Sequence, residues 1–187
     1  MVAPRGSHLV IDVKELRDRP GTQQHLTRTV GVPAEFSTVL VGFRQGEDLE
    51  LDLRLESVHE GVLMTGTASA QVAGQCGRCL DELGYPLTVD VMQLFTFPER
   101  AAQASGEAED EDERLIGDDL TIDLEPVLRD LMVSALPFQP VCREECPGLC
   151  SQCGFRMEDD PEHFHEQIDP RWAALADLRN GLDEPED

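Results

Sequence analysis

Cysteine is concentrated in two short stretches of this 187-residue chain. One stretch is the pair Cys76 and Cys79, with the spacing C-x2-C. The other has the spacing C-x3-C-x3-C-x2-C and consists of Cys142, Cys146, Cys150 and Cys153. Thiolates at such spacings converge on a tetrahedral metal ion, most often Zn²⁺. The sequence therefore predicts a zinc site whose ligands are Cys142, Cys146, Cys150 and Cys153.

Other ligand sets are also chemically sound. Cys76 and Cys79 could join Cys150 and Cys153, because two C-x2-C pairs surround one ion in a zinc ribbon. His163 or His165 could instead replace one cysteine, since neutral imidazole is a good zinc ligand. An iron–sulfur cluster also uses four thiolates. A C-x2-C pair can further act as a redox dithiol, but no βαβ pattern typical of a thioredoxin surrounds either pair.

The predicted metal site is structural rather than catalytic. Four thiolates fill a tetrahedral coordination sphere and leave no position for a water molecule. The sequence contains no H-E-x-x-H motif that would supply a general base beside a metal. We therefore expect no catalytic residue, no enzymatic activity and no small-molecule substrate.

The charge of the chain restricts its partners. The 15 basic residues face 38 acidic ones, and the formal net charge is −23. Binding to naked RNA is not expected, because contact with phosphates requires Lys and Arg, whereas a negative field attracts basic proteins. No apolar run is long enough to span a membrane, and the first residues contain no long apolar segment typical of a secretory signal. A cytoplasmic location with reduced thiols is expected.

The elements that must position the thiols are mostly strands. Apolar and polar residues alternate as in half-buried strands over residues 49–55, 62–72 and 87–97. Shorter strands are predicted at 8–16, 39–43 and 120–122. Residues 17–35, which contain two prolines and two glycines, are predicted to be mostly loop. The pair Cys76–Cys79 falls between two strands and is expected near the end of a hairpin.

Helices are predicted only in the last third of the chain. One covers residues 124–136, with Asp123 as its N-cap and an apolar face for the core. A short amphipathic helix is expected at residues 170–179. The fold class is therefore α+β, with an antiparallel sheet or open barrel, one core helix, a zinc-binding loop and a short C-terminal helix. We expect one domain with a β-rich part (1–98), an acidic flexible linker (99–118) and a C-terminal part with the helix, the zinc loop and an acidic tail (119–187).

Four motifs, in their order along the chain, resemble those of one known family. They are CGRCL at 76–80, ALPFQPVC at 135–142, CPGLCSQCG at 146–154 and DPRWAAL at 169–175. With the β-rich first half and the acidic linker, they resemble the YceD family of bacterial and plastid proteins over nearly the whole chain. Many relatives carry Cys-x-Cys where this chain has His163-Phe164-His165, an exchange that preserves the ability to bind a metal.

The resemblance implies a non-enzymatic role in the biogenesis of the large ribosomal subunit, through accumulation of 23S rRNA. Combined with the negative charge, it leads us to expect a basic ribosomal protein or a pre-ribosomal particle as the partner. The alternative from another class is a thiol redox protein or sensor that uses the cysteine pairs.

Overall fold

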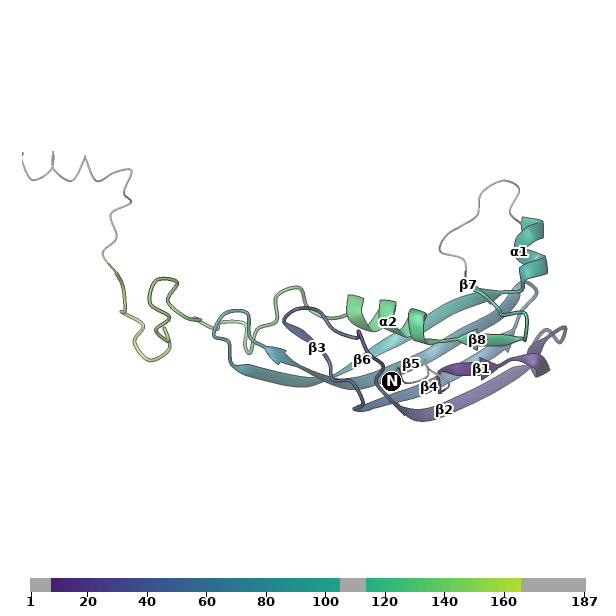
Figure 1. The fold of residues 1–187 in the computed structure, drawn as a ribbon, viewed down its shortest axis with the longest axis horizontal. Coiled ribbons are helices and arrows are strands. Elements are labelled where there is room, and N and C mark those ends of the chain that lie inside the picture. Colours follow the sequence, from purple (N-terminus) through teal and green to yellow (C-terminus); the bar gives the residue numbers. More distant parts are fainter. Residues whose placement is uncertain (1–7, 105–113, 166–187) are drawn as a thin grey trace, which may run out of the picture.

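Three long strands form the centre of the fold. The computed structural model describes residues 8–104 and 114–165. In it, β4 (Asp48–Ser57), β5 (Gly61–Gln75) and β6 (Glu82–Thr96) make an antiparallel meander (Figure 1). The alternation in the sequence produces this arrangement, because every second side chain of a strand points to the same face. Leu51 of β4 pairs with Ala68 of β5, which pairs with Val89 of β6, and all three are buried. The predicted antiparallel meander is confirmed.

Shorter strands extend the meander into an open six-stranded sheet. β2 (Gln23–Gly31) pairs with the free edge of β4, and β3 (Val41–Phe43) pairs with β5. At the other edge, β7 (Arg114–Leu115) runs parallel to β6. The sheet is therefore mixed, whereas the sequence predicted an antiparallel one. Its path ends at β2 and at β7, as in an open sheet rather than a closed barrel.

The prediction of mostly loop over residues 17–35 missed β2, which occupies nine of these 19 residues. In β2 only Leu26 is buried, and His25, Thr27 and Thr29 are exposed. An edge strand with so few buried residues leaves little hydrophobic alternation in the sequence. The pairing with β4 over its whole length, from Gln23 to Gly31, creates the strand.

A helix and a small second sheet lie along the apolar face of the main sheet. α2 (Glu125–Ser134) packs against β6, close to its predicted position. The N-cap is Leu124 rather than the predicted Asp123. The carboxylate of Asp123, one residue earlier, still accepts a hydrogen bond of 3.0 Å from the backbone N–H of Glu125 and so satisfies one free donor at the start of the helix. β1 (Val10–Asp12) pairs with β8 (Thr121–Asp123), and Ile11 and Ile122 face each other in the core. The first strand was predicted at 8–16, but its last three residues form a 3-10 helix (Lys14–Leu16).

The predicted linker contains regular structure at both ends. α1 (Pro98–Ala104) follows β6 directly, so the described residues hold a second α-helix beside the one predicted core helix. β7 lies near the end of the same range, while residues 105–113 lie outside the described part. The predicted helix at 170–179 and the acidic tail also fall outside it. Among the described residues, no helix is long and apolar enough to cross a membrane.

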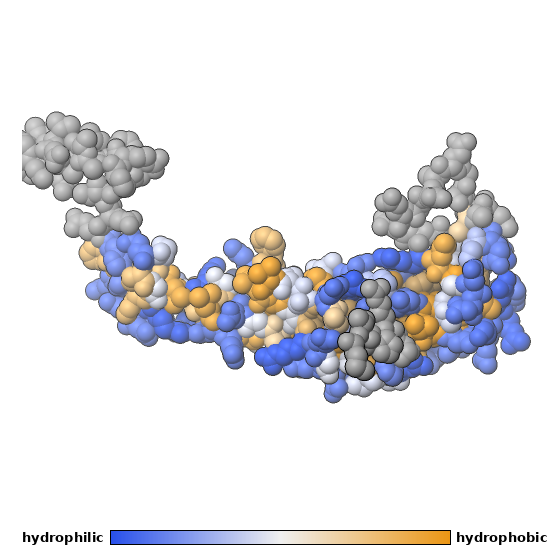
Figure 2. All heavy atoms as spheres, viewed as in Figure 1, coloured by the Kyte–Doolittle hydropathy of each residue, from blue (hydrophilic) through white to orange (hydrophobic). Residues whose placement is uncertain are grey.

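The cysteines are placed by the long hairpin of β5 and β6. Both strands have 15 residues, and their turn lies at one end of the sheet, beyond the end of α2 (Figure 1). The chain that leaves α2 runs toward this turn. On the face shown in Figure 2, apolar residues gather around α2, and hydrophilic residues follow the lower edge.

Two methionines test the core. Met132 of α2 is fully buried, whereas Met92 of β6 is 75% exposed. We expect Met132→Ala to lower the free energy of unfolding by about 2–5 kcal/mol, because it leaves a cavity. The matched change Met92→Ala should alter it by no more than about 0.5 kcal/mol. Urea unfolding followed by circular dichroism measures both, and equal effects would show that α2 does not cover this core.

Candidate metal centre

The turn between β5 and β6 holds Cys76 and Cys79. The backbone N–H of Cys76 donates to the carbonyl of Asp81 (2.8 Å), and the N–H of Leu80 donates to the carbonyl of Cys76 (2.9 Å). This closure requires a left-handed backbone at Leu80 (φ 63°), which is unusual for a residue other than glycine. The tight turn brings the two thiols to the same side of the hairpin end, as in a metal-binding knuckle.

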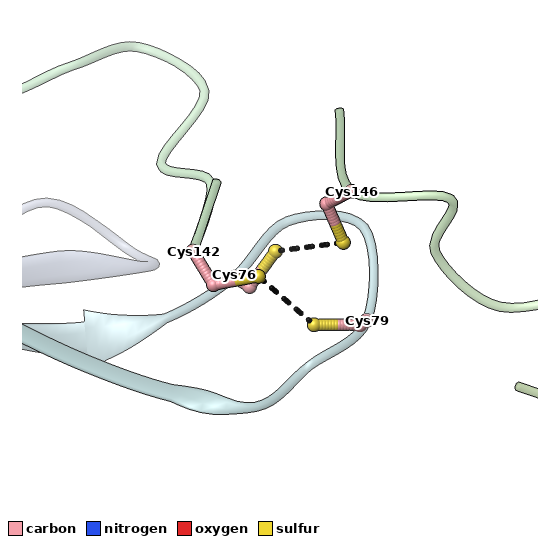
Figure 3. A group of neighbouring side chains, drawn as sticks. All are labelled: Cys76, Cys79, Cys142 and Cys146. Carbon is pink, nitrogen blue, oxygen red and sulfur yellow. Dashed lines mark hydrogen bonds between the residues drawn. The ribbon is translucent and has the colours of Figure 1, made fainter. Parts of the chain in front are cut away.

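Cys142 and Cys146 come from the chain after α2. Two backbone hydrogen bonds attach this chain to the hairpin turn: the N–H of Gly77 donates to Pro140 (2.7 Å), and the N–H of Leu149 donates to Arg78 (3.0 Å). A further turn forms where the N–H of Cys146 donates to the carbonyl of Arg143 (3.1 Å). The two added thiols therefore face the first pair (Figure 3).

The four sulfur atoms have the spacing of a tetrahedral site. All lie within 4.8 Å of one another. The Sγ atoms of Cys76 and Cys146 are 3.9 Å apart, and those of Cys79 and Cys142 are 3.7 Å apart. Sulfurs bound at ~2.3 Å to one zinc ion at tetrahedral corners would be about 3.8 Å apart. All six cysteines are free thiols, so the arrangement fits a metal ion without moving the backbone.

The centre is closed on most sides. The exposed fraction is 0% for Cys76, 4% for Cys146 and 8% for Cys79, whereas Cys142 is exposed. Leu83 and Val141 pack against the three buried cysteines. Sulfur ligands in an apolar, mostly closed pocket are typical of structural metal sites.

Arg78 lies between the two cysteines of the hairpin turn and binds the loop that carries Cys146. Its guanidinium group donates to the carbonyls of Glu144 (3.1 Å) and Cys146 (3.0 Å). One planar donor therefore fixes the loop that presents Cys146. Sequence reasoning gave Arg78 only the status of a motif residue, because no spacing rule connects it with carbonyls 66 and 68 residues away.

One thiol of the cluster loses its proton readily, whereas the neighbouring thiols disfavour the formation of a second thiolate. Burial disfavours the thiolate of Cys76, but hydrogen bonds from the backbone N–H groups of Cys79, Cys142 and Arg78 outweigh it and lower its pKa to about 6. A hydrogen bond from the backbone N–H of Asp81 also favours the thiolate of Cys79. Burial and the neighbouring thiols outweigh this bond and raise the pKa of Cys79 to about 12. Because like charges oppose one another here, a bound cation would be needed for four thiolates.

The remaining predicted ligands lie in a second group. Cys150 and Cys153 meet His163 and His165, and the four ligand atoms again lie within 4.8 Å of one another. Hydrogen bonds from the backbone N–H groups of Cys153 and Gln152 lower the pKa of Cys150 to about 6. The described residues thus contain two groups arranged as possible metal sites.

The structure divides the four ligands predicted from the sequence between these groups. Cys142 and Cys146 belong to the first group, and Cys150 and Cys153 to the second. The ribbon alternative, with Cys76 and Cys79 beside Cys150 and Cys153, is not the grouping found. Cys76 and Cys79 were absent from the main prediction, although their C-x2-C spacing was the signal that could have placed them there.

Comparison with known proteins supports the family resemblance that the sequence motifs indicated. Residues 64–179 match the family model of the large ribosomal RNA subunit accumulation protein YceD. The chain belongs to the YceD family. The matched range includes β6, α2, all six cysteines and all of β5 except its first three residues.

The similar proteins found by sequence carry no assigned function. An uncharacterized protein of Mycobacterium tuberculosis is 46% identical over 172 residues, which cover 92% of this chain and 82% of that protein. An uncharacterized protein of Mycobacterium leprae is 41% identical, with 92% and 78% covered. One of Bacillus subtilis is 31% identical over 120 residues, with 63% and 66% covered. No solved structure is significantly similar to the chain.

The role of Arg78 can be tested without removing a ligand. We expect Arg78→Ala to weaken metal binding at the four cysteines by about 10–100-fold, because groups that orient ligands typically have effects of this size. Arg78→Lys should be intermediate, since an ammonium group keeps the positive charge and the donors but lacks the fixed planar geometry of the guanidinium. Competition with a chromophoric chelator measures the affinity.

The control for Arg78 is Arg44→Ala, which removes an exposed guanidinium that pairs with Glu47 at 3.5 Å. It should bind metal like the unchanged protein. Unchanged affinity in Arg78→Ala would contradict the role of this residue.

Proposed function

We propose that the chain supports the accumulation of large-subunit rRNA as a non-enzymatic assembly factor held together by zinc. Membership of the YceD family carries this proposal, because the family is named for that process. The partner in this proposal is a basic ribosomal protein or a pre-ribosomal particle rather than naked RNA. Two features of the described residues support it: the closed sulfur centre and the acidic outer face of the sheet.

The sulfur centre favours a structural role. Four thiolates select zinc among the common divalent ions and complete its coordination sphere. With no position left for water or substrate, the ion would join the hairpin of β5 and β6 to the chain after α2. Metal binding of this kind contributes directly to folding.

The outer face of the sheet, opposite α2, is polar and acidic except at Met92 and Leu94 of β6. The outward positions on β4 and β6, the two strands that flank β5, carry six carboxylates, and one Arg, Arg54, accompanies them. The carboxylates belong to Asp48, Glu50, Asp52, Glu56, Glu82 and Asp90. Asp52 and Asp90 flank Thr67 of β5 from either side. This regular negative surface is complementary to a basic protein and repels phosphates.

The acidic face can be tested by matched charge removal. The triple change Glu50→Gln, Asp52→Asn and Asp90→Asn should weaken retention of basic large-subunit proteins on the immobilised chain by about tenfold at low salt. The comparison variant, Glu15→Gln, Asp18→Asn and Glu60→Gln, removes the same charge from exposed positions outside this face and should retain them. Quantitative mass spectrometry of a nuclease-treated lysate measures both.

Two results would contradict the proposed partner. One is equal loss of retention in both triple variants, which would show that net charge alone decides binding. The other is retention that is seen with an untreated lysate but disappears after nuclease treatment, which would show that RNA was the bound species.

The cellular role has its own test. In a strain without the protein, the ratio of large-subunit to small-subunit rRNA should fall, and the unchanged gene should restore it. Cys146→Ser removes a buried ligand and should fail to restore the ratio, whereas Arg44→Ala, at an exposed position outside both the sulfur centre and the acidic face, should succeed. Restoration by Cys146→Ser would contradict a role for the sulfur centre.

The thiol redox alternative predicts a different chemical state for the purified protein. Protein prepared under reducing conditions would then contain no metal and would form a reversible disulfide on oxidation. Elemental analysis together with thiol titration distinguishes the two functions.

A further inference from the structure

We propose that Cys150, Cys153, His163 and His165 bind a second divalent ion of the zinc type, separate from the ion of the sulfur centre. We further propose that this ion folds residues 147–165, called here the second knuckle segment, into a small unit docked on the end of the hairpin.

The backbone around Cys150 repeats the knuckle of the hairpin turn. The N–H of Cys150 donates to the carbonyl of Phe155 (2.7 Å), and the N–H of Gly154 donates to the carbonyl of Cys150 (2.8 Å). The hairpin turn has the same two hydrogen bonds at the same spacing, from Cys76 and Leu80. Gly154 has the left-handed backbone (φ 72°) found at Leu80. Two segments that share no sequence beyond C-x2-C thus form the same ligand-presenting turn.

The two histidines complete the set with atoms at coordination spacing. The Nε2 atoms of His163 and His165 lie 3.3 Å and 3.1 Å from the Sγ atom of Cys153, and 3.0 Å from each other. In a tetrahedral site with bonds of ~2.3 Å to sulfur and ~2.05 Å to nitrogen, these separations would be about 3.5 Å and 3.3 Å. Adjustments of half an ångström or less would bring all of them to one ion.

His163 is oriented by its surroundings. Its ring stacks on that of Phe155, with centroids 4.5 Å apart and planes at 27°. Its backbone N–H donates to the carbonyl of Asp160 (3.1 Å), and the carboxylate of Asp160 caps the same turn through the N–H of Glu162 (3.0 Å). These contacts point the imidazole of His163 back toward the thiols.

The second knuckle segment has no hydrophobic core to order it. All 19 residues from 147 to 165 lie in the described part of the chain, and not one apolar side chain among them is buried. Ordering a backbone costs roughly 1–2 kcal/mol per residue, so another source of free energy is required. A metal ion is the usual source in small units of this kind.

The segment is attached to the sulfur centre without sharing its ligands. The guanidinium of Arg156 pairs with both carboxylate oxygens of Asp81, just after the hairpin cysteines, and Arg143 pairs with Glu158 at 2.7 Å. Exposed ion pairs such as these are weak. The backbone N–H of Leu149 also donates to the carbonyl of Arg78 (3.0 Å) at the start of the segment. Loss of the second ion should therefore release the residues after Leu149 and leave the sulfur centre and the sheet in place.

Cobalt substitution tests the proposal, because the spectrum of Co²⁺ reports its ligands. The unchanged protein should bind about two equivalents with a mixture of four-sulfur and two-sulfur, two-nitrogen spectra. The double variant His163→Ala, His165→Ala should bind about one equivalent. Because it would lose two of six cobalt–sulfur bonds, its charge-transfer absorption should fall by about a third.

Trypsin provides a second measurement on the same variant. Cleavage after Arg156 should become at least about tenfold faster when the second ion is lost, because the local unit opens. The unfolding transition of the sheet should stay unchanged. The control His25→Ala, His59→Ala removes two exposed histidines from other elements and should keep two equivalents and slow cleavage.

Clear results would overturn the proposal. Binding of one equivalent by the unchanged protein would exclude a second ion. Two equivalents with an unchanged spectrum in His163→Ala, His165→Ala would exclude these ligands. Equally fast cleavage after Arg156 in the unchanged and double-variant proteins would show that the ion does not fold the segment.

Discussion

The cysteine end of the fold depends on a long-range closure between two parts of the chain, which meet at four thiols and at the backbone hydrogen bonds beside them. Cys76 and Cys146 are 70 residues apart in sequence, yet their Sγ atoms lie 3.9 Å apart. Between them run β6, α1, β7, β8 and α2, so the closure encloses much of the second half of the structure. A cross-link across so long a loop restricts the unfolded chain more than a local one does. The closure holds the hairpin end against the chain that leaves α2, while α2 itself is placed by the hydrophobic core.

The central sheet separates two kinds of interaction. Its inner face buries the leucines of β4 and the valines of β6 against α2, and this face supplies the hydrophobic stabilisation. Its outer face repeats carboxylates and hydroxyl groups along the same strands. In β4, for example, the leucines at odd positions from 49 to 55 contribute to folding. The carboxylates at positions 48, 50, 52 and 56 of the same strand contribute to the proposed recognition. Changes on the outer face can alter binding while the fold remains intact.

Much of the fold could be predicted because its strands bury one face. The alternation in β4, β5 and β6 indicated their position, and the apolar spacing of α2 indicated the helix that covers them. β2 was missed because an edge strand with one buried side chain has almost no such alternation. The parallel pairing of β7, over two residues only, arises from tertiary contacts that no local pattern records.

The sites were predictable in chemistry but not in pairing. The residue types indicated groups that could bind a metal, and the structure contains two such groups. The spacing could not show that Cys142 and Cys146 belong to one group and Cys150 and Cys153 to the other. The division comes from the path after Cys146, where Gly148 passes against the backbone of Arg78. A Cβ at Gly148 would lie 2.9 Å from the carbonyl oxygen of Arg78. This close approach carries the chain past the first knuckle and directs Cys150 away from it.

The length of the β5–β6 hairpin has a consequence for larger assemblies. Fifteen residues at ~3.3 Å each give strands of about 50 Å. The cysteines lie at one end of this span, and α1 follows β6 at the other. A molecule that touched the cysteine end and another that touched the α1 end would be held apart by a stiff spacer of nearly fixed length.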